Sequence, residues 1–193
     1  MDRMVEADAG DHAVRYKGIA VALHWITAAL LLTQVWVGLQ FADMAKGPAR
    51  DGLFTWHKTL GATILLLAVV RLIVRLRNPP PPFPQDLPKW ERLVAVWNHR
   101  IFYFLLFALP LTGLATVSAR APGSTTPMIG GIPLPLIPGL HGVKGIGDIH
   151  VILGWTTLAL LVLHVGAALK QQFFDKTGIA DRMPPFHSPR HGG

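Results

Sequence analysis

Four histidines lie within apolar segments of the chain, and their spacing indicates where chemistry takes place. They are His24, His57, His150 and His164. An imidazole is costly to bury in hydrocarbon without a partner, so such a residue indicates a functional site. His150 and His164 are fourteen residues apart. On a helix this spacing keeps both on one face, within roughly 40°, and separates them by about 21 Å along the axis.

Four apolar segments are long enough to cross a bilayer and would position these histidines. They cover about residues 18–41, 54–76, 93–118 and 148–172. The chain is 51% hydrophobic and only 15% charged, whereas soluble domains carry about 25% charged residues. The sequence therefore predicts an all-α fold, a four-helix transmembrane bundle.

The domain organisation and orientation follow from the polar residues around these segments. We expect a polar N-terminal tail at 1–17, a membrane domain at 18–174 and a C-terminal tail at 175–193. With the N-terminus inside, thirteen of the eighteen Lys and Arg lie on the inner side. This bias predicts that both termini are cytoplasmic. The net charge of +7 does not indicate nucleic acid, because the charges flank apolar runs, where lipid head groups account for them.

Two connecting segments are rich in proline. Residues 77–92, on the cytoplasmic side, are expected to be extended rather than helical. Residues 119–147, on the outer side, are rich in both Gly and Pro. This second segment is either a plain connector or a loop that folds over the end of the bundle.

The orientation places the histidines at two depths. His57 is level with His150 near the outer surface, and His24 is level with His164 near the inner one. Two facing histidines between helices suit a six-coordinate haem with two imidazole axial ligands. Zinc is the competing metal, but it usually takes three or four protein ligands, and no carboxylate or thiol lies at either level.

The sequence therefore predicts two stacked haems between the helices. His24 and His164 would bind the inner haem iron, and His57 and His150 the outer one. The chain has no cysteine, which excludes disulfides and the covalent attachment of a c-type haem.

Small and cationic residues accompany the histidines. The residue four positions after each histidine is small: Ala28, Gly61, Gly154 and Ala168. Such residues leave room for a flat porphyrin, although small residues are also common where transmembrane helices touch. Arg71 and Arg75 lie on the same helix face as His57, at the inner level. They would bind haem propionates or extend to lipid phosphates, and the sequence does not decide between these roles.

Two haems about 21 Å apart along the bundle would permit electron transfer across the membrane. A proton pump would need a chain of buried carboxylates. Because no Asp or Glu lies well inside any segment, the sequence favours electron transfer.

Five stretches of sequence carry a resemblance to a known family. They are "ALHW" (22–25), "WHKTLG" (56–61), "VVRLIVRL" (69–76), "YFLLFALPLTGL" (103–114) and "IHVILGWTTLALLVLHVGAAL" (149–169). Together they resemble the bacterial cytochrome b561 family, over about residues 15–185. The resemblance implies a bundle in the bacterial inner membrane with two b haems, the four histidines being the matching ligand positions. It also implies one-electron exchange with ubiquinone.

Within that family the likeness is greatest to members that pass electrons from superoxide to ubiquinone. Those members carry a histidine near the quinone after the last ligand. This chain has Gln171 in its place, and we expect its amide to hydrogen-bond a quinone carbonyl, while the departure leaves the details of the quinone site open. A cationic outer mouth would attract the superoxide anion. Lys58 and Lys144 are the candidates for this steering, with Arg120 and His141 in the same outer region. The alternative is that these are ordinary loop charges.

Two functions are consistent with these features. The first is a di-haem membrane oxidoreductase that transfers single electrons between superoxide, or another periplasmic donor, and ubiquinone. The second is a membrane-anchor electron carrier between the quinone pool and a partner dehydrogenase, hydrogenase or reductase. A docking partner would use residues 77–92 or 119–147.

Overall fold

The computed structural model describes residues 18–80, 82–83 and 87–175. The predicted N-terminal tail and, apart from residue 175, the C-terminal tail lie outside the described residues. The four long helices are α1 (Gly18–Ala42), α2 (Pro48–Arg77), α3 (Lys89–Arg120) and α4 (Ile146–Lys170). The shorter elements are β1 (Thr125–Pro127), a 3-10 turn η1 (Ile129–Gly131), β2 (Pro133–Pro135) and a π-helical turn η2 (Gln171–Asp175).

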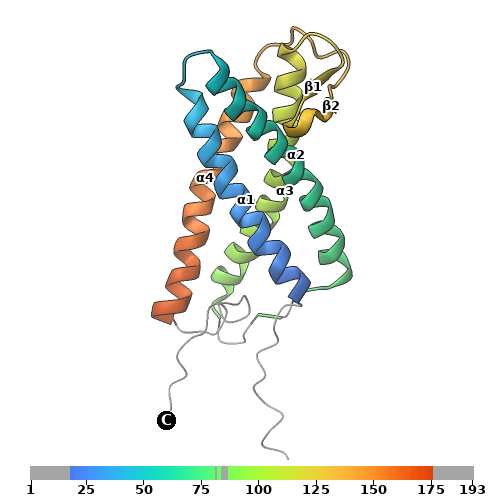
Figure 1. Ribbon diagram of the computed structural model, residues 1–193. Helices are drawn as coiled ribbons and strands as arrows, with labels where there is room; N and C mark the ends of the chain where they lie inside the picture. Colours follow the sequence, from blue (N-terminus) through green and yellow to red (C-terminus); the bar gives the residue numbers. More distant parts are fainter. Residues whose placement is uncertain (1–17, 81, 84–86, 176–193) are drawn as a thin grey trace, which may run out of the picture.

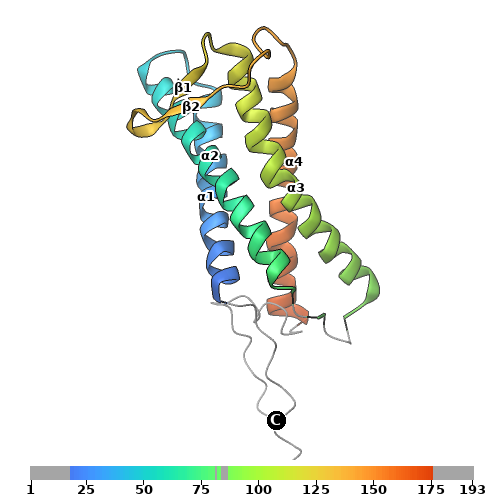
Figure 2. The ribbon, with the colours of Figure 1, turned by 90° about the vertical axis from the view of Figure 1, so that its right-hand side faces the viewer.

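The predicted four-helix membrane bundle is confirmed. In the described part of the chain, four helices are long and apolar enough to cross a membrane. They run side by side along the long axis of the molecule (Figure 1). α1 begins and α4 ends at the same end of the bundle, opposite β1 and β2, as the prediction for the two termini requires (Figures 1 and 2). The assignment of that end to the cytoplasm stays a prediction.

α2 and α3 begin several residues earlier than the sequence predicted, and α4 begins at Ile146 where the prediction placed residue 148. α2 begins at Pro48, where the prediction placed residue 54. Proline is well suited to the first turn of a helix because a backbone N–H at that position has no hydrogen-bond partner within the helix, so proline loses nothing by lacking one. α3 begins at Lys89, so the expectation of an extended segment through residue 92 is wrong at its end. Pro88 caps this helix, and Glu91 lies in its first turn, where a negative charge is favourable.

The helices do not pack evenly around the bundle. α1 packs closely on α2, α3 on α4 and α2 on α3, whereas α4 approaches α1 and α2 much less closely. The buried core lies where α1, α2 and α3 meet. Its central cluster is formed by Ile64, Ala68 and Leu106, with Leu30 and Phe107 packed against them. The space beside α4 is therefore the part of the bundle that the helices themselves do not fill.

The outer loop folds over the end of the bundle, which settles the choice left open by its sequence. β1 and β2 pair antiparallel, with Thr126 opposite Leu134. Two hydrogen bonds attach this hairpin region to α2: Lys58 Nζ donates to Thr126 Oγ1 at 2.7 Å, and the Ile129 N–H donates to Thr59 Oγ1 at 3.0 Å. The loop thus covers α2 directly beside His57.

Candidate haem-binding centre

The outer pair of histidines, His57 and His150, bridges the space between α2 and α4. The centroids of the two rings are 6.2 Å apart, and their planes are at 89° to each other. Phe41 of α1 packs its edge against the His57 ring at 5.1 Å between centroids. The prediction that these two histidines share one depth is confirmed.

The inner pair, His24 and His164, bridges the space between α1 and α4. The ring centroids are 6.4 Å apart, with an angle of 50° between the planes. Trp25 and Phe102 contact the two rings edge-on, at 5.4 Å from His24 and 5.4 Å from His164. Both predicted pairs therefore form, and each uses one histidine of α4.

The separation within each pair fits one metal ion between two imidazoles. Two metal–nitrogen bonds of about 2 Å, with about 1 Å from each nitrogen to its ring centre, place the centroids about 6 Å apart. Among the residues that the structure describes, no three His, Cys, Asp or Glu side chains converge as possible metal ligands. Two protein ligands on opposite sides suit a haem iron, whose other four ligands belong to the porphyrin, better than they suit zinc.

A cavity of about 400 Å³ opens between the outer histidines. This volume is within the range of cofactor pockets, and its lining is mainly apolar, as such pockets require. Gly61 and Gly154, two of the four small residues expected to leave room for the porphyrin, are part of the lining. A side chain at Gly154 would meet no atom within 4 Å, so the space beside this glycine is open.

Two further glycines hold the rings of the outer pair, and the sequence prediction missed both. A Cβ atom on Gly38 of α1 would lie 3.1 Å from Cε1 of His57. A Cβ atom on Gly113 of α3 would lie 3.1 Å from Cε1 of His150. Each ring therefore rests against bare backbone of the adjacent helix. A glycine inside an apolar helix is a sequence sign of close approach, but it does not identify the partner.

Helix α3 contributes no histidine to either pair, yet it contacts both histidines of α4. Thr112 Oγ1 lies 3.1 Å from Nδ1 of His150. The side-chain amide of Asn98 lies 2.9 Å from Nδ1 of His164. The sequence prediction named neither residue.

Arg71 reaches the inner pair rather than the surface. Its Nη2 atom is 3.4 Å from Nδ1 of His24, and the guanidinium lies 5.9 Å from the centre of the Tyr103 ring. Arg75 follows one helical turn later on α2, closer to the inner end. The half-buried position of Arg71 argues against an extension to lipid phosphates.

His57 has unsatisfied polar atoms around it. Its Nδ1 is buried without a hydrogen-bond partner, and so is the Oε1 atom of Gln34. The amide nitrogen of Gln34 donates to the main-chain carbonyl of His57 at 3.0 Å. Both side chains line the outer cavity, so their free atoms belong to a site built to hold something polar.

At the inner end, a third histidine lies beside the inner pair. His99 of α3 has its ring centroid 5.7 Å from that of His164, and its Nδ1–H donates to the Ala95 carbonyl at 2.7 Å. This position is next to the inner pair rather than among lipid head groups.

Gln171, predicted to contact ubiquinone, lies in the π-helical turn η2. Its Nε2 donates to Glu91 Oε2 at 2.6 Å, and Lys170 Nζ is 3.5 Å from the other oxygen of the same carboxylate. The neighbouring Gln172, which the prediction missed, is only 7% exposed and has a buried Oε1 without a partner. Single π turns often occur at functional sites.

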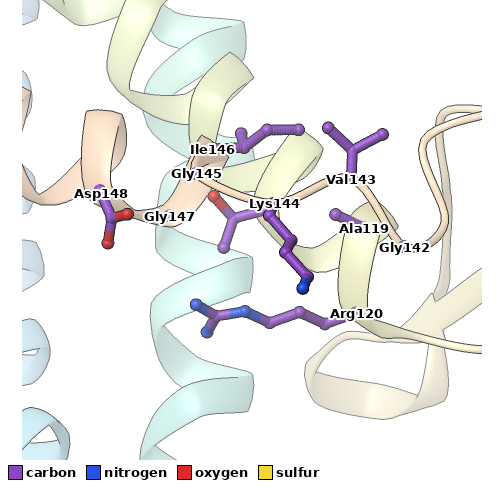
Figure 3. Close-up of a pocket in the computed structure, with 10 residues that line it drawn as sticks. Ala119, Arg120, Gly142, Val143, Lys144, Gly145, Ile146, Gly147 and Asp148 are labelled. Atoms are coloured by element: carbon purple, nitrogen blue, oxygen red, sulfur yellow. The ribbon is translucent and has the colours of Figure 1, made fainter.

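The two lysines predicted to steer superoxide differ in their surroundings. Lys58 lines the outer cavity, and its Nζ donates a hydrogen bond to Thr126 Oγ1. The same Nζ lies 5.2 Å from the centre of the Phe54 ring. Lys144 is exposed at the N-terminus of α4, where it lines a second cavity of about 310 Å³. Figure 3 shows Lys144 and Arg120 reaching into the same space, with Asp148 also among the lining residues.

The second cavity adjoins the outer cavity. Thr116, Arg120 and Gly147 line both. A Cβ atom on Gly147 would lie 2.7 Å from Nη2 of Arg120, so the guanidinium lies directly on the first turn of α4. Two cationic side chains thus stand at the opening beside the outer pair.

Comparison with known proteins gives a family. The model of the family described as prokaryotic cytochrome b561 matches residues 15–185. The chain belongs to this family. It is 30% identical to cytochrome b561 homolog 2 of Escherichia coli K12, over 88% of this chain and 90% of that protein. It is 27% identical to a probable superoxide oxidase, CybB, of Yersinia pestis, over 89% of this chain and 96% of that protein.

Membership of the cytochrome b561 family accounts for the main features of the structure. A multi-pass membrane bundle and a cofactor of b-type haem are what the family name implies. The chain is therefore a bacterial membrane protein of electron transfer. The predicted all-α bundle and the resemblance seen in the sequence are both confirmed.

Proposed function

We propose that this chain holds two b haems and passes single electrons from superoxide at the outer face of the bacterial inner membrane to ubiquinone at the inner face. His57 and His150 bind the outer iron, and His24 and His164 bind the inner one. The observation that carries the proposal is the presence of two histidine pairs with ring centroids 6.2 and 6.4 Å apart, at two depths along α4.

The reaction balances with two superoxide anions for each ubiquinone. Each superoxide gives up one electron and leaves as O₂, and ubiquinone takes up both electrons together with two protons to become ubiquinol. Bound haem supplies the one-electron couple at each level. The protein holds the two sites about 21 Å apart on one helix and keeps water away with apolar side chains.

Arg71 is the candidate partner of an inner haem propionate. A histidine that binds iron through Nε2 carries its hydrogen on Nδ1. Arginine can only donate hydrogen bonds, so a ligated His24 cannot accept one from Arg71 at that atom. The guanidinium, now 3.4 Å from Nδ1 of His24, would therefore pair with an anion close by. Arg75, one turn away, is the second candidate.

Ubiquinone is proposed to bind at the inner end, near the inner pair. Gln171 remains a candidate for a hydrogen bond to a quinone carbonyl, although its amide is bonded to Glu91 in this structure. His99 is a second candidate for a contact with the quinone, because its ring lies 5.7 Å from that of His164. The Nδ1 atom of His99 is hydrogen-bonded to the Ala95 carbonyl, which leaves Nε2 for the quinone.

One experiment tests the proposed function directly. The purified chain is assayed for haem content, reduced with superoxide, and followed by haem absorbance with and without ubiquinone. We expect two haems per chain, prompt reduction, and reoxidation that depends on ubiquinone. A chain that holds two haems but does not react with superoxide would instead be the membrane-anchor carrier, whose electrons come from a partner protein.

Superoxide steering makes a separate prediction about rate. A unit charge about 10 Å from the point of encounter changes the rate by about twofold in water at low salt. We therefore expect Lys144→Gln to slow the reduction by superoxide about twofold, and the double change with Lys58→Gln to slow it about fourfold. The measurement is the bimolecular rate constant as a function of ionic strength, and the difference from wild type should vanish at high salt.

Lys46→Gln is the matched control. Lys46 is an exposed lysine of the loop between α1 and α2, on the same outer side, and it lines neither cavity. An equal loss of rate in this variant would show that net charge matters and that the two cavity lysines do not. An unchanged rate and salt dependence in the double variant would rule out steering by these residues.

A further inference from the structure

Helix α3 presents two polar side chains with the same spacing as the two histidines of α4. Asn98 and Thr112 are fourteen residues apart, as are His150 and His164. Because α3 and α4 run in opposite directions, Thr112 meets the outer histidine and Asn98 the inner one. The contacts are 3.1 Å from Thr112 Oγ1 to Nδ1 of His150 and 2.9 Å from the Asn98 amide to Nδ1 of His164.

We propose that Thr112 and Asn98 are positioning residues that set the reduction potentials of the outer and inner haem separately. Each accepts a hydrogen bond from the Nδ1–H of one α4 histidine and thereby keeps Nε2 of that ring available for iron. This inference rests on the proposed ligation of haem by the histidine pairs. It gives α3, which has no ligand of its own, a distinct role at both sites.

The main-chain contacts of Thr112 favour one direction for its hydrogen bond to His150. Its hydroxyl has one hydrogen, and the carbonyl oxygens of Ala108 and Leu109 lie 2.7 and 3.0 Å from Oγ1. With that hydrogen directed to the main chain, a lone pair of Oγ1 faces His150. The ring must then donate from Nδ1, which leaves Nε2 unprotonated and able to bind a metal.

The amide of Asn98 can act in the same way. Its oxygen and nitrogen ends have nearly the same shape, so a half-turn of the group exchanges them without a steric cost. In the structure it is Nδ2 that faces the ring, at 2.9 Å from Nδ1. In this orientation the amide donates to Nδ1 of His164, and the ring hydrogen sits on Nε2, where it blocks ligation. With Oδ1 toward the ring, the amide accepts from Nδ1–H and Nε2 is free. Ligation therefore requires the oxygen to face His164.

A hydrogen bond from Nδ1–H makes the imidazole a stronger electron donor to the metal. A stronger donor stabilises the oxidised iron more than the reduced iron, so the bond lowers the reduction potential. Removing the acceptor should raise the potential of the haem bound by that histidine. The other haem should not respond, because its own partner on α3 is unchanged.

The test is a redox titration of each haem in purified variants. Replacing a residue that hydrogen-bonds a metal ligand typically changes metal affinity or activity by a factor of about ten or more. We expect Thr112→Val to favour the reduced form of the outer haem about tenfold. For one electron this raises its reduction potential by about 59 mV. Thr112→Ser keeps the hydroxyl and should keep the wild-type potential. Thr112→Ala serves as a second variant if the valine variant does not fold.

Thr156→Val is the matched control on α4. Thr156 is exposed, and its hydroxyl donates to the Ile152 carbonyl within its own helix, so it has the same local bond without the histidine. Both haem potentials should be unchanged in this variant. A shift equal to that of Thr112→Val would mean that helix stability, and not the bond to His150, controls the potential.

Asn98 allows a test with two opposite signs. Asn98→Leu removes the acceptor and should raise the potential of the inner haem. Asn98→Asp supplies an acceptor with more negative charge and should lower it. If both variants shift the inner haem upward, the amide acts as a donor to His164, and the inference is wrong at this site.

The outcomes separate this inference from the proposed function. A wild-type chain without two haems would overturn the proposed ligation. A chain with two haems whose potentials ignore Thr112→Val, Thr112→Ala and Asn98→Leu would overturn only the role of α3. A shift of the inner haem by Thr112→Val would contradict the separate assignment of the two partners.

Discussion

Replacing His150 with alanine is expected to leave one haem per chain in place of two, and to reduce electron transfer from superoxide to ubiquinone to the background rate. The outer pair would lose one of its two imidazoles. The remaining ring, that of His57, has its centroid 6.2 Å from that of the wild-type His150 ring, across the cavity. No other His, Cys, Asp or Glu converges there among the described residues, so nothing would replace the lost ligand. The measurement is haem content with the optical spectrum of the haem that remains.

The four histidine variants can be sorted into pairs without knowing which spectrum belongs to which depth. His57→Ala and His150→Ala should retain the same haem, with the same absorbance maxima and reduction potential. His24→Ala and His164→Ala should both retain the other one. If His150→Ala instead matched His24→Ala, the pairing by depth would be wrong.

His99→Ala is the control for these variants. His99 lies on a membrane helix with its ring 5.7 Å from that of His164, so it is a histidine next to the inner pair that belongs to neither pair. Both haems should remain in this variant. Loss of one of them would mean that His99 serves as a ligand.

The histidine pairs could be predicted from the sequence because their signal is one-dimensional. A period of 3.6 residues and a fixed rise convert a spacing of fourteen residues into one face and two depths. The direction of each span then decides which histidines are level, and the ring contacts agree with that reasoning. No contact between side chains had to be known.

The partners of these histidines could not be predicted because their role depends on how helices pack. Gly38, Gly113, Thr112 and Asn98 lie on the helix beside the ring that each one contacts. Nothing in the sequence says which face of α3 turns toward α4. Once the ligands are placed, the matching interval from Asn98 to Thr112 is a sign that sequence reasoning could have used.

The early start of α3 was missed for a different reason. Proline was taken as a sign of extended chain up to residue 92, but Pro88 is the N-cap residue directly before the helix, which begins at Lys89. The same residue type that stops one helix is favourable at the start of the next. This start places Glu91 within a helix, where its carboxylate accepts a hydrogen bond from the side-chain amide of Gln171.

The uneven packing of the bundle explains why α4 supplies a histidine to both pairs. α4 packs closely on α3 but leaves space toward α1 and α2, and both histidine pairs cross that space. A flat cofactor in each position would complete the contacts that the helices do not make. Haem binding and the stability of the bundle are then expected to be linked.

Replacing Gly113 with valine is expected to expel the outer haem and leave the inner one in place. Even the first added carbon would lie 3.1 Å from Cε1 of His150, and the ring cannot retreat without leaving the iron. Overpacking of this kind costs about 1–3 kcal/mol, which weakens binding about 5- to 150-fold. Gly38→Val should act in the same way through His57 and lose the same haem.

Gly166→Val provides the matched comparison for the glycine variants. Gly166 lies inside α4, two residues after His164, and a side chain there would meet no atom within 4 Å. Both haems should remain, because the added carbons project into open space. The measurement is haem content and thermal stability of Gly113→Val, Gly38→Val and Gly166→Val. If Gly113→Val and Gly38→Val keep two haems with unchanged spectra, the rings of the ligated histidines do not rest against these glycines, and the outer site has a different geometry.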